Sequence, residues 1–95
     1  MKPGAEAIRI EEIDREWIAA FNAGDVETVL SLYTGDVVVM PPGEPALHGR
    51  EAVGRWLHGF FEHHTARQSL VNDEVVVAGE WAWMRGHFSL VIEPR

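Results

Sequence analysis

Two polar side chains near the C-terminus could carry acid–base chemistry. Residues 81–92 alternate as in a β-strand, and one face of that strand carries both Arg85 and His87. A neutral histidine exchanges a proton near pH 7, and an arginine stays charged and can hold a carboxylate or an oxyanion. His87 and Arg85 are therefore the candidate catalytic residues. The alternatives are a hydrogen-bonded or solvent-facing His87, and an Arg85 that forms a salt bridge to Glu74 or Glu80.

Aromatic side chains are frequent enough to line a binding pocket. The chain has four Trp, four Phe and one Tyr among its 95 residues. Large flat side chains suit a flat apolar ligand, although aromatic residues at helical spacing also form ordinary core. The candidate pocket residues are Trp17, Phe21, Tyr33, Met40, Trp56, Phe60 and Trp83.

No metal or cofactor is expected from the sequence motifs. His58, His63 and His64 do not have the i, i+4 spacing that places two ligands on one helical face. The sequence has no cysteine, which excludes disulfides, thiolate nucleophiles and cysteine metal sites. Glycine-rich phosphate loops and nucleophile elbows are also absent from it.

Charge and hydropathy limit the partners. A formal net charge of −7 disfavours nucleic acid and anionic membranes, because both need a basic surface. The longest apolar runs, such as residues 37–40 and 75–78, are far too short to span a bilayer. Residues 1–4 lead into a charged segment rather than an apolar one, so no secretory signal is predicted and the expected location is cytoplasmic.

Three helices are predicted to position these residues. Apolar side chains recur at helical spacing over residues 10–21 and again from about residue 50 onward. Gly24 can take the left-handed conformation that ends the first helix. Asp25 can then cap a short second helix over residues 26–33.

The predicted strands form one short segment and one long hairpin. Residues 37–40 favour a strand that Pro41 and Pro42 must end. Residues 67–78 and 81–92 predict the hairpin, with a bulge at residues 72–73 and a turn between the two strands. The fold class is therefore α+β: a single domain over residues 1–95, with three helices packed on one side of a curved antiparallel sheet.

Several segments, taken in order, resemble the SnoaL-like branch of the nuclear-transport-factor-like superfamily, which includes ketosteroid isomerases and polyketide cyclases. The matching segments are residues 16–25, 32–37, 42–45 and 49–53, and the resemblance covers about residues 8–93. It implies a cone, in which a bent sheet wraps around a long helix and an apolar pocket opens at the wide end. The resemblance also places the face that carries Arg85 and His87 inside the cone.

The chain departs from this pattern in its chemistry. Ketosteroid isomerases have a carboxylate base after the first strand, whereas the matching residues 40–42 contain no acid. Their first-helix tyrosine corresponds to Trp17, and their second oxyanion acid would lie beyond Arg95. Steroid isomerisation is therefore disfavoured.

The second departure concerns the sheet. Two further strands usually follow in the family at the position corresponding to Arg95, and without them residues 81–92 form a long unpaired apolar edge. Either the sequence is truncated before these strands, or another chain covers the edge. Of the two, the prediction is a homodimer, or association of this edge with another chain.

Two functions agree with these observations. The first is binding of a small apolar molecule in an aromatic pocket, with isomerase, cyclase or dehydratase chemistry as the associated reactions. The second is a non-catalytic ligand-binding or oligomerisation domain of the same fold. The sequence leaves open whether the chain is an enzyme.

Overall fold

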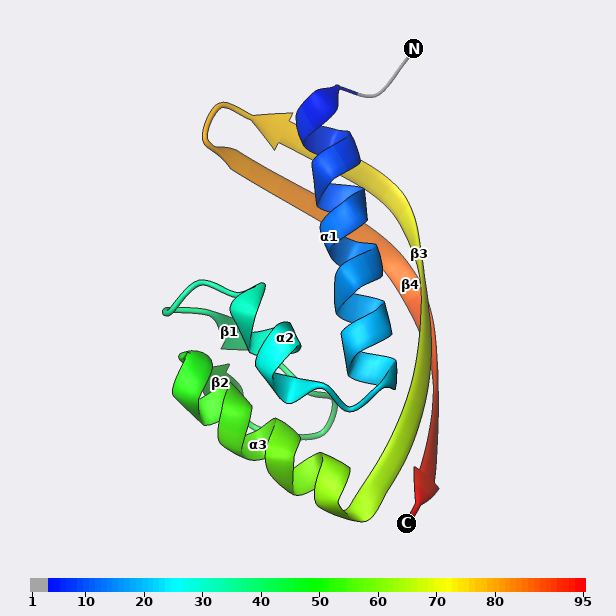
Figure 1. The fold of residues 1–95 in the computed structure, drawn as a ribbon. Helices are drawn as coiled ribbons and strands as arrows, with labels where there is room; N and C mark the ends of the chain where they lie inside the picture. The colour runs from blue at the N-terminus through cyan, green and yellow to red at the C-terminus, as the bar shows by residue number, and fades with distance from the viewer. Residues whose placement is uncertain (1–3) are drawn as a thin grey trace.

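A computed structural model describes residues 4–95. The elements in chain order are α1 (Ala5–Asn22), α2 (Val26–Ser31), β1 (Val38–Val39), β2 (Leu47–His48), α3 (Arg50–His63), β3 (His64–Ala78) and β4 (Trp81–Pro94). In Figure 1, β3 and β4 form a long bent ribbon that curves around α1, with α2 and α3 grouped at one end of it. The α+β class and the packing of three helices on one side of a curved antiparallel sheet are confirmed.

The junction between α1 and α2 forms as predicted. Gly24 has a φ of +70°, a conformation that side chains with a Cβ rarely adopt. The Asp25 carboxylate accepts hydrogen bonds from the hydroxyl of Thr28 (2.6 Å) and from its backbone N–H (3.2 Å). These two bonds, the hydroxyl bond first, lower the pKa of Asp25 below its ordinary value. The chain therefore passes from α1 to α2 through residues 23–25 alone.

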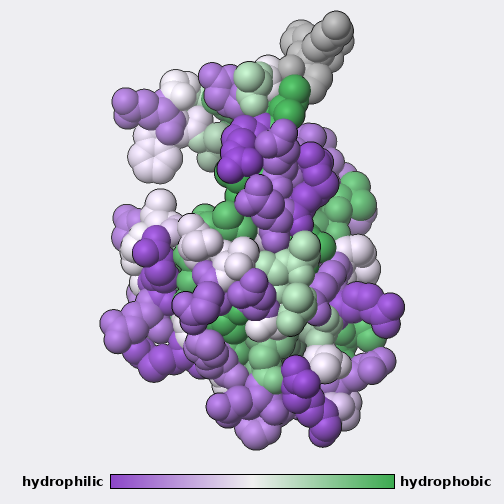
Figure 2. Space-filling view, in the orientation of Figure 1, coloured by the Kyte–Doolittle hydropathy of each residue, from purple (hydrophilic) through white to green (hydrophobic). Residues whose placement is uncertain are grey.

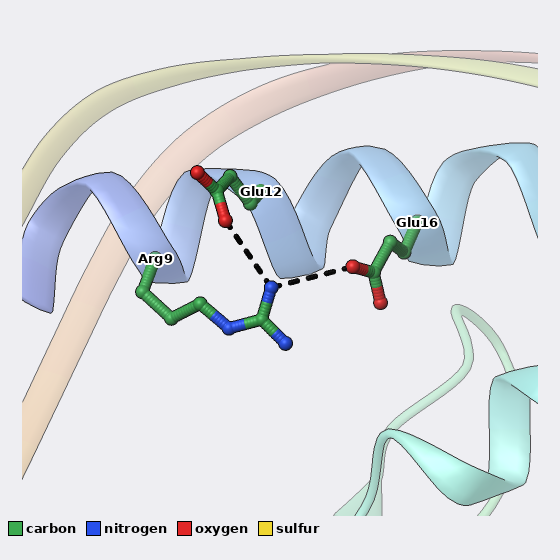
Figure 3. A network of polar contacts seen from close by, with 3 residues as sticks. All are labelled: Arg9, Glu12 and Glu16. Atoms are coloured by element: carbon green, nitrogen blue, oxygen red, sulfur yellow. Dashed lines mark hydrogen bonds and ion pairs between the residues drawn. The ribbon is translucent and has the colours of Figure 1, made fainter.

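The exposed surface of α1 carries its own ion-pair network. Arg9 reaches Glu12 at 3.2 Å and Glu16 at 3.4 Å (Figure 3). The hydrogen bond to Glu12, followed by the negative charge of Glu16, raises the pKa of the guanidinium. Because all three side chains are exposed to solvent, these pairs contribute little to stability and serve mainly to keep α1 hydrophilic on its outer side.

The hairpin of β3 and β4 is paired along its whole length, from His64 opposite Pro94 to Ala78 opposite Trp81. The predicted bulge is confirmed, because the register shifts between Asn72 and Glu74. The predicted turn is confirmed as well, and Gly79 adopts a φ of +61° within it. Strand β3 begins earlier than expected, because the chain becomes extended at the first residue after α3.

The short strand β1 is smaller than the predicted segment over residues 37–40, and it has a partner that the sequence did not reveal. Val38 pairs with His48 and Val39 with Leu47 in a separate two-stranded sheet. Strands of two residues carry too little alternation to be recognised in a sequence. Their pairing brings the loop over residues 40–46 back toward the start of α3.

The buried core lies among the helices and the start of β3. Its residues are Ala20, Phe21, Val26, Val29, Val53, Leu57 and Ala66. Within residues 4–95, β4 contributes nothing to this core, and many of its large apolar side chains are exposed. Figure 2 shows the outer side of α1 as hydrophilic, with apolar residues visible in the hollow beneath the hairpin tip. No helix in the described part of the chain is long and apolar enough to cross a membrane.

Candidate functional site

A cavity of about 640 Å³ lies between the helices and one face of β4. Its walls come from α1, the segment after α2, β1 and the loop that follows it, α3, the start of β3 and the second half of β4. The residues predicted for a pocket that do line it are Trp17, Phe21, Tyr33, Met40, Trp56 and Phe60. The strand residues Phe88, Leu90 and Ile92 complete the wall. The lining is therefore mostly aromatic and aliphatic, with few polar atoms.

The predicted orientation of β4 is wrong. Phe88 and Leu90 line the cavity, so Trp83, Arg85 and His87 lie on the opposite face of the strand and outside the cavity. Arg85 bonds Glu74 at 3.0 Å, and His87 lies 3.2 Å from Asp73. The side chains of Arg85 and His87 are 68% and 70% exposed.

The physical reason for this orientation is visible in the contacts of β3. The Asn72 amide donates to the Asp14 carboxylate of α1 at 2.7 Å, which directs that face of β3 toward the helix. Leu70 lies on the same face of β3 as Asn72 and pairs with Phe88. Phe88 therefore lies on the helix-facing side of β4. That face of β4 is apolar throughout, whereas the opposite orientation would bury Arg85 at a high cost in desolvation.

The Tyr33 hydroxyl is one of the few polar groups in the cavity wall. Its oxygen accepts a hydrogen bond from the indole N–H of Trp17 at 2.8 Å. An indole nitrogen only donates, so the Tyr33 proton is not used in this bond, and no group among residues 4–95 accepts it. Burial raises the pKa of Tyr33, and the Trp17 hydrogen bond offsets part of that rise. Tyr33 is thus protonated at neutral pH and able to donate into the cavity.

A second polar group in the wall is His64, which the sequence analysis considered only as a metal ligand. Its Nδ1 lies 3.1 Å from the Phe60 carbonyl oxygen, and its ring stacks on that of Phe60 at 5.0 Å. Because a carbonyl only accepts, Nδ1 carries the hydrogen and Nε2 of the neutral ring has a free lone pair. The Phe60 carbonyl also accepts the backbone N–H of His64, and no signal in the sequence indicated that the His64 ring would line a cavity.

The loop over residues 40–46 adds one polar side chain, Glu44, to the wall. Glu44 accepts a hydrogen bond from the Trp56 indole at 3.0 Å, which connects this loop to α3. Arg50, at the start of α3, donates to the backbone carbonyl of Tyr33. These two contacts hold the Trp56 ring and the segment after α2 in place around the cavity.

Another hollow, of about 590 Å³, lies between α1 and β3. Its lining includes Glu11, Asp14, Arg15 and Asn72, and it has no aromatic side chain. It is open and polar, so it is the weaker candidate for an apolar ligand. No group of three or more metal-ligating side chains occurs within residues 4–95.

Comparisons with known proteins agree with this architecture. Residues 15–95 match the SnoaL-like domain family. No curated protein matches the sequence. A conserved protein from Planctomyces limnophilus DSM 3776 is 25% identical, with a TM-score of 0.87 over 96% of this chain and 70% of that one. A ketosteroid isomerase-like protein from Erwinia carotovora atroseptica is 28% identical, with a TM-score of 0.82 over 97% of this chain and 78% of that one.

A more distant structure shares the fold alone. An LEH-like epoxide hydrolase from M. tuberculosis is 15% identical, with a TM-score of 0.66 over 92% of this chain and 64% of that chain. A protein named as ketosteroid isomerase-like and one named as an epoxide hydrolase thus share this fold. The function must therefore be argued from the side chains of the cavity.

Proposed function

The chain belongs to the SnoaL-like domain family, and from this premise we propose that its cavity binds a small, flat, apolar molecule. The observation that carries the proposal is the aromatic wall. Trp17 and Phe21 stack at 5.1 Å with an angle of 9° between their planes, and Trp56 and Phe60 stack at 5.5 Å with an angle of 14°. A volume of about 640 Å³ lies within the range of small-molecule pockets.

Exposed apolar surface along the cavity supports the same proposal. Met40 is 76% exposed and Phe88 is 54% exposed, although both lie in the wall. A ligand that covers these side chains would gain about 25 cal/mol for each Å² of apolar surface removed from water. The cavity therefore offers a driving force for binding that a filled core would not.

Titration with a flat neutral dye tests this proposal. The naphthyl ketone prodan, whose emission shifts to the blue when it leaves water, should bind the protein saturably. Phe88→Ala should weaken binding about fivefold to tenfold, because it removes an aromatic contact from the wall. Trp83→Ala is the matched control: Trp83 is 52% exposed on the same strand, but it lies outside the cavity. Equal losses of prodan affinity in Phe88→Ala and Trp83→Ala would contradict the proposal.

A second candidate function is proton transfer on an enolisable ketone, and two polar residues of the wall, Tyr33 and His64, favour it. Nε2 of His64 would take a hydrogen from the carbon beside the carbonyl. The C–H electron pair would form the new C=C bond as the carbonyl pair moves onto oxygen. Tyr33 would donate its hydrogen bond to that oxygen. Return of the proton to the same carbon completes an exchange, whereas in a conjugated dienolate its delivery to the γ-carbon completes an isomerisation.

Hydrogen–deuterium exchange distinguishes this activity from simple binding. With 2-tetralone in D₂O, the wild-type protein should accelerate exchange of the α-hydrogens, as followed by NMR. The acceleration by His64→Gln should be at least tenfold smaller than that by the wild type, since an amide cannot act as the base. Prodan binding by His64→Gln should stay close to wild type. Wild-type exchange no faster than in buffer would rule out the proton-transfer function and leave a binding domain.

A further inference from the structure

Gln68 is a polar side chain that the aromatic cavity shares with the hollow between α1 and β3. It lies on the helix-facing side of β3, because it has the same parity as the buried Ala66 and as Asn72, whose amide reaches α1. It is partly buried, and it belongs to the lining of both spaces. The Gln68 side chain therefore lies at the boundary between an apolar space and a polar one.

The backbone of Gln68 is held by the last residue of α1. The Asn22 carboxamide oxygen accepts a hydrogen bond from the Gln68 N–H at 2.7 Å, and the Asn22 amide donates to the Gln68 carbonyl oxygen at 3.0 Å. On the other side of β3, Gln68 is paired with Leu90 of β4. Because a helix and a strand both hold this position, the Gln68 side chain leaves the sheet from a fixed point.

The carboxamide of Gln68 forms no hydrogen bond within residues 4–95, where the bonds outside the sheet belong to its backbone. A carboxamide offers two N–H donors and an oxygen acceptor. When a ligand displaces water from such a group without bonding to it, the lost hydrogen bonds reduce the affinity. A ligand that brings a hydrogen-bonding group to Gln68 is therefore favoured over one that is apolar there.

We propose that Gln68 is a specificity-determining residue, which selects ligands with a neutral hydroxyl group at one end of a flat apolar body. The inference rests on the proposed binding function. Neither lysine nor arginine is among the residues that line the cavity, whereas Glu44 is one of them. A ligand carboxylate would thus be desolvated without a cation to pair with. A hydroxyl group is neutral, and it can both donate to and accept from the carboxamide.

The position of Gln68 along β3 limits the length of the ligand. His64 lies on the same face of the strand, four residues earlier, so the two Cα atoms are about 13 Å apart. Both side chains line the cavity and can extend toward a ligand that lies between them. Two fused six-membered rings with a polar group at each end fit this spacing. The ligand class is therefore a bicyclic ketone with a hydroxyl group at the end opposite to the carbonyl.

Calorimetric titration of the wild-type protein with three ketones tests the inference. The first is 2-acetylnaphthalene, the second is 6-acetyl-2-naphthol, which adds the hydroxyl group, and the third is 2-acetyl-6-methoxynaphthalene, whose ether cannot donate. The naphthol should bind about fivefold to tenfold more tightly than 2-acetylnaphthalene, as expected for one added hydrogen bond. A methyl ether that binds as tightly as the naphthol would overturn the proposal, because apolar contact would then explain the added affinity.

The variant Gln68→Met keeps the length of the side chain and removes its hydrogen-bonding groups. For this variant, the naphthol and 2-acetylnaphthalene should bind within about twofold of each other. Arg67→Met is the matched control: Arg67 is exposed on the opposite face of β3 and outside the cavity, so the full preference for the naphthol should remain.

Two results would overturn the role of Gln68 alone: a wild-type protein that binds 2-acetylnaphthalene but does not prefer the naphthol, or a preference for the naphthol that persists in Gln68→Met. If none of the three ketones binds the wild type, the binding function itself is contradicted, and this inference with it. The two failures are thus distinguishable in one set of titrations.

Discussion

Replacing Phe21 with alanine should lower the free energy of unfolding by about 3–5 kcal/mol. Phe21 is 6% exposed, and its ring lies 5.1 Å from that of Trp17 and 5.3 Å from that of Phe61. Removing it leaves a cavity between α1 and α3 and removes the aromatic contacts as well. Because domains of this size are stable by only about 5–15 kcal/mol, the variant should be close to unfolded.

Urea denaturation of a matched variant checks this prediction. Phe88→Ala makes the same substitution at a half-exposed position. It should lower the free energy of unfolding by less than half as much as Phe21→Ala does. Phe21→Leu retains most of the buried volume and should remain folded, which allows a measurement where Phe21→Ala does not. Equal losses in the free energy of unfolding for Phe21→Ala and Phe88→Ala would show that Phe21 and the rings it contacts are not the core of the fold.

Replacing Gly86 with alanine should destabilise the protein by about 3 kcal/mol or more. A Cβ at this position would lie 2.1 Å from the carbonyl oxygen of Val71 on β3. That oxygen belongs to the backbone of the paired strand, so the new methyl group can be accommodated only if the two strands move apart. Gly86 is opposite Asn72, beside the bulge, where such movement would also disturb the Asn72–Asp14 contact with α1.

Gly59→Ala is the control for this prediction. Gly59 is in α3, and a Cβ there would meet no atom within 4 Å. Since alanine is the better helix former, Gly59→Ala should stabilise the protein by about 0.5–1 kcal/mol. The midpoint temperature of thermal unfolding should therefore fall for Gly86→Ala and rise for Gly59→Ala. A Gly86→Ala protein as stable as wild type would contradict the close approach of β3 and β4.

The order of the elements and the class of the fold could be read from the sequence because each rests on local chemistry. The left-handed Gly24 and the capping Asp25 act within a few residues of each other. The bulge after Asn72 and the turn at Gly79 are likewise local features. The pairing of β1 with β2 was missed because it joins segments too short to show a pattern.

The face of β4 that meets the helices depends on contacts between distant segments, and here the resemblance misled. It placed Arg85 and His87 inward, although the opposite face, from Met84 to Ile92, carries no charge. An apolar face is the one that a sheet normally buries, so alternation alone favoured the observed orientation. The alternative interpretation of Arg85, a salt bridge to Glu74, agrees with the structure.

The cavity could be predicted in part. Aromatic residues on α1 and α3 were recognised from their helical spacing, and Trp17, Phe21, Trp56 and Phe60 do line one space. The role of His64 could not be predicted, because it depends on the ring of Phe60 and on the immediate start of β3 after α3. The hydrogen bond from Trp17 to Tyr33 joins residues 16 positions apart and is likewise a tertiary contact.

A crystal structure of the protein with 2-acetylnaphthalene tests the central claim, that the aromatic cavity is a ligand site, most directly. We expect the naphthalene ring between the Trp56–Phe60 stack and Phe88. The ketone oxygen should lie within about 3 Å of the Tyr33 hydroxyl. An empty cavity with the ligand bound elsewhere, or aromatic side chains that fill the space themselves, would contradict the claim.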